Sequence, residues 1–537
     1  MRERKAVMLT ALFFALLTLI GLATAPDYGL PCDEPAEQII LQENLMEYSL
    51  ALLGQDSPPA VYYRQRGITP ISQSIERDHG QSAYYLAAPI LQWQADAPDT
   101  AMTLWHGYTW LWFMVGVLSL YLLLRRLGAG RLVACAGALL LYLSPRFFAE
   151  GHYNNKDMVL LSLTLLTVAA GAQWMIKPTW RRAVLFSLAG ALAANTKIVG
   201  LFVWGLMGLA TALHLRLHGK LTRQHWCAAA VAIITFVLTY WLLTPAAWRD
   251  PVAYLQYILH NATGFSRWSG VVLFRGVLYN PTRGMPLPRT YLPLMVLYTL
   301  PPLTLLLAAG GQVLALVRIL RKDGNAALLA ALTVLWLVPM VFVVAARPLM
   351  YNGWRHFYFL FAGIAALAGY GLVGLAKALQ GKVWRQRIAV CAMAAALLLQ
   401  AVGIARNHPY QYVYYNALAQ NTQTEFEQDY WLVSTVNAMR DLLALQASGS
   451  NQPLVLGARD PMSLFGVQHG AAVLSARESE RLKITEDETA PYLLYNTTYA
   501  RIYDVLPPEG YQEILHIESY GSVMTTVYQQ SASLLQP

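Results

Sequence analysis

Long apolar runs separated by short polar loops recur along the first three quarters of the chain. A helix of about 20 apolar residues crosses the roughly 30 Å hydrocarbon core of a bilayer. The pattern therefore predicts an α-helical polytopic membrane protein with about eleven transmembrane helices. The predicted spans are 8–25, 104–124, 131–147, 157–176, 183–197, 198–215, 226–245, 291–309, 326–346, 356–376 and 388–404.

Basic residues gather in six of the loops between these runs, and with eleven spans all six fall on the same side. Cytoplasmic loops carry the excess of Lys and Arg, so this side is predicted to face the cytoplasm. The clusters are Arg2/Arg4/Lys5, Arg125/Arg126/Arg131, Lys177/Arg181/Arg182, Arg216/Lys220/Arg223, Arg318/Arg321/Lys322 and Lys377/Lys382/Arg385/Arg387.

The first apolar run has two interpretations. It resembles a cleavable signal peptide that ends at Ala23-Thr24-Ala25, but it is longer than the usual apolar region of such a peptide. We favour an uncleaved first span. In both cases the residues that follow lie on the outer side of the membrane, which places the first long loop, 26–103, outside.

Composition changes after about residue 405, where charge rises and the long apolar runs stop. We predict two parts, a transmembrane domain over 1–404 and a small extramembrane α/β domain over 405–537 on the outer side. Short β-rich stretches alternate there with a polar helical stretch at 431–446. The expected strands are 453–457, 490–495 and 522–529.

The overall composition agrees with a membrane protein, because 56% of the residues are hydrophobic and only 13% are charged. The net charge of +9 is explained by the cytoplasmic loops facing anionic lipid, so we predict membrane lipids and no nucleic acid among the partners. The four cysteines show no CxxC or metal-ligand spacing, so neither a disulfide framework nor a zinc site is indicated.

Ionisable residues converge on the outer ends of the spans. Each has an ordinary structural explanation: Asp33 and Glu34 can cap a helix over 36–53, Asp157 can cap the span it begins, and Arg355 can be an interfacial anchor. Together, acids from two loops and bases from two others describe a cavity with a general base and anion-binding groups. The set is Asp33, Glu34, Asp78, His79, Glu150, His152, Lys156, Asp157, Arg355 and His356.

The order of five motifs in the chain carries a resemblance. The sequence resembles bacterial membrane glycosyltransferases with the GT-C fold, relatives of the protein O-mannosyltransferases and of the aminoarabinose transferases of lipid A. The resemblance covers about residues 1–435. The motifs are Cys32-Asp33-Glu34-Pro35, Asn154-Asn155-Lys156-Asp157, Gly353-Trp354-Arg355-His356-Phe357, His408-Pro409-Tyr410-Gln411-Tyr412 and Phe426-Glu427-Gln428-Asp429-Tyr430-Trp431.

The resemblance implies transfer of a sugar from a polyprenyl-phosphate donor to a glycan, lipid or protein acceptor on the outer face of a bacterial inner membrane. Asp33 matches the catalytic acid of the first outer loop and would act as the general base. Glu34 would orient or tune Asp33, and Asp157 matches the second acidic position. The resemblance assigns no cofactor; for a divalent cation, Asp33 and Asp157 are the candidate ligands.

The leaving lipid phosphate needs positive charge, which Lys156, Arg355 and His356 are expected to supply. Further candidate substrate-binding residues are Asp78, His79, His152 and Tyr412. The sequence departs from many relatives at Asp78-His79-Gly80, where they carry His-Pro-Pro, so no particular sugar is transferred from the resemblance.

Two other functions fit parts of the pattern. A transporter or flippase for a lipid-linked glycan or another amphipathic substrate also needs many spans and buried charge, although such charges usually lie at the bilayer midplane on broken, repeated helices. An assembly subunit that docks partners through 405–537 leaves the acidic pair unexplained. We therefore place the glycosyltransferase first.

Overall fold

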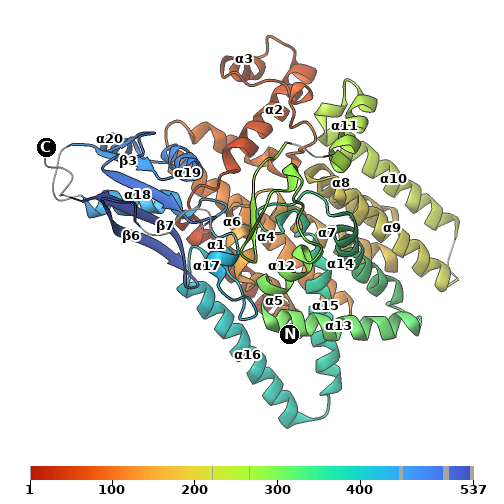
Figure 1. Cartoon of the computed structure of the whole chain (residues 1–537). Coiled ribbons are helices and arrows are strands. Elements are labelled where there is room, and N and C mark those ends of the chain that lie inside the picture. Colours follow the sequence, from red (N-terminus) through yellow and green to blue (C-terminus); the bar gives the residue numbers. More distant parts are fainter. Residues whose placement is uncertain (1, 220–221, 265–266, 447–451, 500–506, 532–537) are drawn as a thin grey trace.

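The computed structural model describes residues 2–219, 222–264, 267–446, 452–499 and 507–531. Within these ranges, nine helices are long and apolar enough to cross a membrane. They form the large helical body in Figure 1. These helices are α1 (Arg2–Thr24), α4 (Pro98–Arg126), α7 (Asp157–Ile176), α9 (Val199–Leu217), α10 (Arg223–Leu243), α13 (Pro302–Leu320), α14 (Ala326–Ala346), α15 (Leu360–Ala378) and α16 (Val383–Arg406).

A tenth span is formed if α5 (Arg131–Tyr142) and α6 (Pro145–Tyr153) count as one, although they meet at a bend of 70°. Pro145 fixes the backbone at this bend. The remaining predicted span, 183–197, falls in α8 (Trp180–Thr196), whose 17 residues are at the lower limit of a membrane-crossing helix. The predicted helical membrane protein with a small C-terminal α/β domain is confirmed.

One predicted span is displaced in the chain. The run 291–309 is not one helix, because α12 (Tyr291–Thr299) ends before Pro301 and the spanning helix α13 begins at Pro302. The two prolines have no backbone N–H to donate and disfavour continuation of the helix that precedes them. The span therefore lies about ten residues later than the apolar run indicated.

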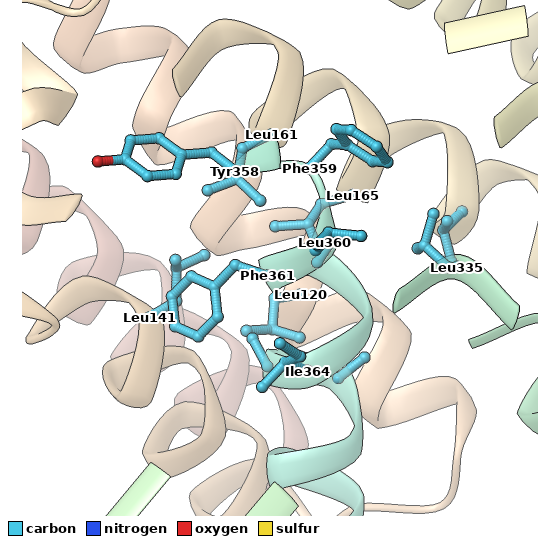
Figure 2. Close-up of a cluster of buried hydrophobic side chains, with 14 of the residues drawn as sticks. Leu120, Leu141, Leu161, Leu165, Leu335, Tyr358, Phe359, Leu360, Phe361 and Ile364 are labelled. Atoms are coloured by element: carbon cyan, nitrogen blue, oxygen red, sulfur yellow. The ribbon is translucent and has the colours of Figure 1, made fainter. Parts of the chain in front are cut away.

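The core of the helical body is centred on α15, whose residues are buried from Leu360 to Tyr370. Figure 2 shows Phe361 and Ile364 of this helix packed among leucines of neighbouring helices. Gly311 of α13 allows this packing, because a Cβ there would lie 1.8 Å from the carbonyl oxygen of Leu367 in α15. Small residues permit such close approach of helix backbones.

The long loop 26–103 covers one end of the bundle. It holds α2 (Glu34–Leu53), as the predicted helix 36–53 indicated, and then α3 (Pro58–Gln65) and two 3-10 segments, Ile71–Gln73 and Ser82–Trp93. At the same end lie α11 (Pro251–Gly264) and a short hairpin, β1 (Val272–Phe274) and β2 (Val277–Tyr279). In Figure 1, α2, α3 and α11 stand together above the spans.

The C-terminal domain contains a five-stranded mixed sheet of order β4-β3-β5-β7-β6. β3 pairs in parallel with β4 and β5, and β7 runs antiparallel to β5 and β6. The three predicted strands are found as β3, β5 and β7. The elements are α17 (Thr422–Glu425), α18 (Ser434–Leu445), β3 (Leu454–Ala458), α19 (Pro461–Ala471), α20 (Ala476–Arg481), β4 (Leu482–Ile484), β5 (Tyr492–Asn496), β6 (Tyr511–Ser519) and β7 (Ser522–Gln530).

This domain and the membrane part share one apolar cluster. Tyr28, from the loop 26–103, and Tyr153, from α6, lie in the same cluster as Trp431, Leu442 and Leu494. The sheet domain therefore packs directly on the end of the bundle where the loop 26–103 lies.

Candidate functional site

The site begins at the first turn of α2. Asp33 occupies the N-cap position, and Pro35 lies in the first turn, where a missing N–H costs nothing. The Asp33 side chain makes no capping hydrogen bond to the helix. Its carboxylate is instead held by a residue 322 positions later in the chain. Helix capping therefore does not account for this acid.

The partner of Asp33 is Arg355. The Arg355 Nη1 donates to Asp33 Oδ2 over 2.6 Å, and the Arg355 side chain is 6% exposed whereas that of Asp33 is 42% exposed. The guanidinium carbon lies 4.5 Å from the centre of the Trp431 ring and 5.3 Å from that of Tyr351. These contacts hold the cation in place next to an acid that remains open to solvent.

The pair changes the ionisation of the acid. Burial raises the pKa of the Asp33 carboxyl, but the charge and the hydrogen bond of Arg355 lower it by more, so the net pKa lies below its ordinary value. Asp33 is thus an ionised carboxylate at neutral pH. While Arg355 is bound to it, it is also a weak base.

The periodicity of α2 divides its acids between two faces. Asp33 and Glu37 are four residues apart and lie on one face, while Glu34 lies on another. Glu37 Oε1 accepts from the Lys156 ammonium over 3.0 Å. Glu34 is buried and its Oε2 lies 3.0 Å from Nε2 of His106 in α4. Glu34 therefore contacts α4 rather than the group of charges around Asp33.

Asp157 and Lys197 complete the group of charges, which consists of Asp33, Glu37, Lys156, Asp157, Lys197 and Arg355. Asp157 begins α7, and its backbone N–H donates to Asn154 Oδ1 over 2.9 Å. Its carboxylate accepts a hydrogen bond from Lys197, which lies at the break between α8 and α9. Lys197 was not among the predicted site residues and stood only at the end of the predicted span 183–197. The signal that could have found it is the polar stretch Asn195-Thr196-Lys197 between two apolar runs.

His356 lies within the same group, but without charge. Burial, followed by the neighbouring positive charges of Lys197 and Arg355, holds the pKa of His356 well below its ordinary value. The imidazole is therefore neutral at pH 7. The positive charge available to an anion comes from Lys156, Lys197 and Arg355.

Asp78 and His79 lie in a separate group in the loop 26–103. Asp78, His79 and Glu76 are, among the described residues, the one group of three His, Cys, Asp or Glu side chains spaced to hold a metal ion. Arg267 already binds this group, with Nη2 at 2.9 Å from both Asp78 oxygens and Nη1 at 2.7 Å from Glu76 Oε2. The Arg267 guanidinium thus binds the carboxylate oxygens that a metal ion would need at this position.

Asp33 and Asp157, the other candidate metal ligands, are likewise bound by cationic side chains. The Asp33 carboxylate binds Arg355 and that of Asp157 binds Lys197. Each acid is thus neutralised by a side chain of this protein.

His152 and Tyr412 are fully buried away from solvent. The His152 ring stacks between Tyr28 and Trp110, each 4.3 Å away between ring centres, and its nitrogens face backbone carbonyls of Gly21 and Phe148. The Tyr412 hydroxyl donates to the Asp429 carboxylate. Both side chains are bound within the protein.

The segment 429–431 joins the group of charges to the C-terminal domain. The backbone N–H of Cys32 donates to the Trp431 carbonyl over 2.9 Å, directly before Asp33. The Asp429 carboxylate accepts from the backbone N–H of Ser434 over 3.1 Å and from Asn496 Nδ2 over 3.0 Å. Trp431 thus contacts both Cys32, the residue before Asp33, and Arg355. Asp429 connects the segment that contains Trp431 to the sheet domain.

A second buried network supports the loop before Arg355. Gly353 adopts a positive φ of 67°, and its N–H donates to Glu427 Oε2 over 3.1 Å. Burial raises the pKa of Glu427 to about 8, so this acid carries its proton at neutral pH. Tyr358, just after Arg355, donates to Glu150 Oε1 over 2.6 Å.

The fold and the site define a polytopic helical membrane protein with a charged, partly open site at one end of its spans. Residues 82–259, about a third of the chain, match the family described as dolichyl-phosphate-mannose-protein mannosyltransferase, PMT. For that part of the chain, the match confirms the resemblance to the protein O-mannosyltransferases. It includes Lys156, Asp157 and Lys197 but neither Asp33 nor Arg355. No curated protein matches the chain.

Solved structures similar to this chain include the following three. Apo ArnT from Cupriavidus metallidurans aligns over 100% of both chains with 12% identity and a TM-score of 0.49. ArnT bound to undecaprenyl phosphate aligns over 98% of this chain and 99% of that chain, with 14% identity and a TM-score of 0.48. The apo oligosaccharyltransferase of Archaeoglobus fulgidus aligns over 85% of this chain and 69% of that chain, with 11% identity and a TM-score of 0.39.

Proposed function

We propose that this protein is an integral-membrane glycosyltransferase that moves a sugar from a polyprenyl-phosphate donor to a glycan, lipid or protein acceptor. The observation that carries the proposal is the contact between Asp33 and Arg355, which places a solvent-accessible carboxylate next to a fixed guanidinium. The match to a family named for a dolichyl-phosphate sugar donor supports the choice of a lipid phosphate.

In this reaction the acceptor oxygen attacks the anomeric carbon of the donor sugar. The bond from that carbon to the phosphate oxygen breaks, and its electron pair remains on the phosphate. The acceptor proton passes to the Asp33 carboxylate, which acts as general base. The lipid phosphate gains negative charge as it leaves, so it needs positive charge rather than a proton.

Arg355, Lys156 and Lys197 are the groups proposed to bind the phosphate. Arg355 suits this role because its fork of N–H donors matches phosphate oxygens. The two lysines add charge from the starts of α7 and α9, and each is kept close by an acid, Glu37 or Asp157. These cations stabilise charge that develops in the transition state.

The active site is proposed to lie on the outer face of the inner membrane. Contacts between the predicted basic loops support this orientation: Arg131 pairs with Glu3, and Arg126 donates to Asn325 over 3.1 Å. The N-terminus, the α4–α5 loop and the α13–α14 loop thus meet at one end of the bundle. By the positive-inside rule this end faces the cytoplasm.

The alternative function is a transporter or flippase for a lipid-linked glycan. Its charges would be expected near the bilayer midplane on broken helices. Asp33 lies instead in the loop 26–103, Lys156 directly precedes α7, and Arg355 lies five residues before α15.

The first prediction tests the proposed base. Asp33→Asn keeps the size and one hydrogen-bond acceptor of the side chain but removes the charge. Sugar transfer should fall about 10²- to 10⁴-fold, the usual loss for a general base. The measurement is transfer from a polyprenyl-phosphate sugar, in detergent or nanodiscs, to the acceptors of the native membrane.

Asp27→Asn is the matched control, because Asp27 is an exposed acid six residues away that pairs with His408 over 2.7 Å. It should retain nearly all activity. Full activity in a folded Asp33→Asn protein would rule out the proposed base.

A further inference from the structure

Arg355 has hydrogen-bonding capacity that its contacts leave unused. It donates to Asp33 through Nη1, and its Nε is buried without a hydrogen-bond partner among the described residues. A buried guanidinium N–H without an acceptor is costly, and a fork of donors suits an anion with two oxygens. The side chain is therefore ready to bind a second anionic group.

The two lysines differ from Arg355 in how they are held. Lys156 is bound by Glu37 and Lys197 by Asp157, and both of these acids are buried. Arg355 is bound by Asp33, the one acid of the three that is partly exposed, with 42% of its side chain accessible. An ion pair that reaches solvent on one side is the easiest of the three to open, because the released carboxylate can be hydrated.

We propose that Asp33 and the donor phosphate compete for Arg355, so that binding of the phosphate releases the Asp33 carboxylate to act as base. This inference rests on the proposed function. Trp431 and Tyr351 hold the guanidinium where it is, so the exchange needs movement of the Asp33 side chain rather than of the arginine. The base is then freed only when a donor is present.

The groups that face Asp33 define the electrostatics of the exchange. Arg355 and, at longer range, Lys156 attract its carboxylate, whereas Asp157 repels it; the Cys32 thiol donates to it over 3.5 Å. A phosphate on Arg355 removes the strongest of these attractions. It also adds a negative charge beside the carboxylate, which favours proton uptake from the acceptor hydroxyl.

The experiment is a double-mutant cycle on binding of sugar-free polyprenyl phosphate to the full-length protein in detergent. Asp33→Asn removes the competitor and should tighten binding about tenfold, the effect of about 1.4 kcal/mol of lost competition. Arg355→Gln should weaken binding. In the Arg355→Gln protein, Asp33→Asn should change affinity by less than about twofold, because the shared cation is gone.

Asp157→Asn is the matched control for general charge removal, since this acid belongs to the same group of charges but is bound to Lys197. Its effect on affinity should be similar with and without Arg355→Gln. Thermal unfolding of each variant checks that it is folded before binding is measured.

Three results would contradict these proposals, and they are distinguishable. If Arg355→Gln weakens binding but Asp33→Asn does not tighten it, the competition is wrong and the proposed donor site stands. If Asp33→Asn tightens binding equally in the Arg355→Gln protein, the effect is general repulsion and the competition is again wrong. If the unsubstituted protein does not bind polyprenyl phosphate, the proposed function fails and this inference with it.

Discussion

At the scale of single residues, the site consists of three ion pairs: Asp33 with Arg355, Glu37 with Lys156 and Asp157 with Lys197. A buried charge that loses its partner is strongly destabilising, so substitution of one member of a buried pair also affects folding. Asp33 is itself partly exposed, but its substitution leaves the buried Arg355 without a carboxylate partner. Thermal unfolding of Asp33→Asn therefore has to be measured beside its activity, so that loss of chemistry is separated from loss of folding.

The buried acid behind the site gives a pH prediction. The pKa of Glu427 is raised by burial from an ordinary 4.5 to about 8, so between these values the folded protein keeps a proton that the unfolded chain releases. Stability therefore falls as pH rises through this window, by up to about 1.4 kcal/mol per pH unit. Glu427→Gln should remove this dependence.

Thermal unfolding of wild type and Glu427→Gln in detergent at pH 5 and pH 8 measures the effect. The stability of Glu427→Gln relative to wild type should increase as the pH rises. Glu425→Gln, two residues away and only half-buried, is the matched control and should follow wild type. A Glu427→Gln protein with an unchanged pH profile would contradict the raised pKa.

At the scale of elements, the sequence pattern predicted those helices and strands that are determined by neighbouring residues in the chain. The helix after Asp33 and strands β3, β5 and β7 were predicted because periodicity and β-rich composition are local signals. The partition of acids in α2 was missed, although helical periodicity already placed Glu37 rather than Glu34 on the face of Asp33. The contact of Trp431 with Arg355 joins residues 76 positions apart and leaves no local signal.

Close packing of α13 on α15 gives a prediction at this scale. Gly311→Ala would place a methyl group 1.8 Å from the Leu367 carbonyl oxygen, which belongs to helix backbone and cannot move alone. The free energy of unfolding should fall by about 1–3 kcal/mol or more, as in other overpacked cores.

Gly310→Ala is the control within the same helix, because its Cβ would meet no atom within 4 Å. Alanine has the better helix propensity, so this variant should be as stable as wild type or slightly more so. The measurement is thermal unfolding of both variants in detergent. Equal stability of the two would contradict the close approach of α13 and α15.

At the scale of the whole molecule, the bundle has one basic end and one end that carries the charged site and the sheet domain. The proposed orientation predicts that Lys382 faces the cytoplasm and Glu513 the outer side. Both residues are exposed. Single-cysteine variants Lys382→Cys and Glu513→Cys, made after replacement of the four native cysteines, can be labelled with an impermeant maleimide.

In intact spheroplasts, Glu513→Cys should be labelled and Lys382→Cys should react only after permeabilisation. The reverse result would place the site on the cytoplasmic side and contradict the proposed outer-face reaction.

The contacts of the segment 429–431 also bear on the order in which the protein is made. Trp431 is held through Asp429 to Ser434 and to Asn496, which belongs to β5. Ribosomal synthesis reaches Asn496 only after every spanning helix has been translated. A nascent chain with all its helices inserted can therefore already form the Ser434 contact but still lacks the Asn496 contact that ties this segment to the sheet. The full support of Trp431, and through it of Arg355, is completed only after β5 has been synthesised.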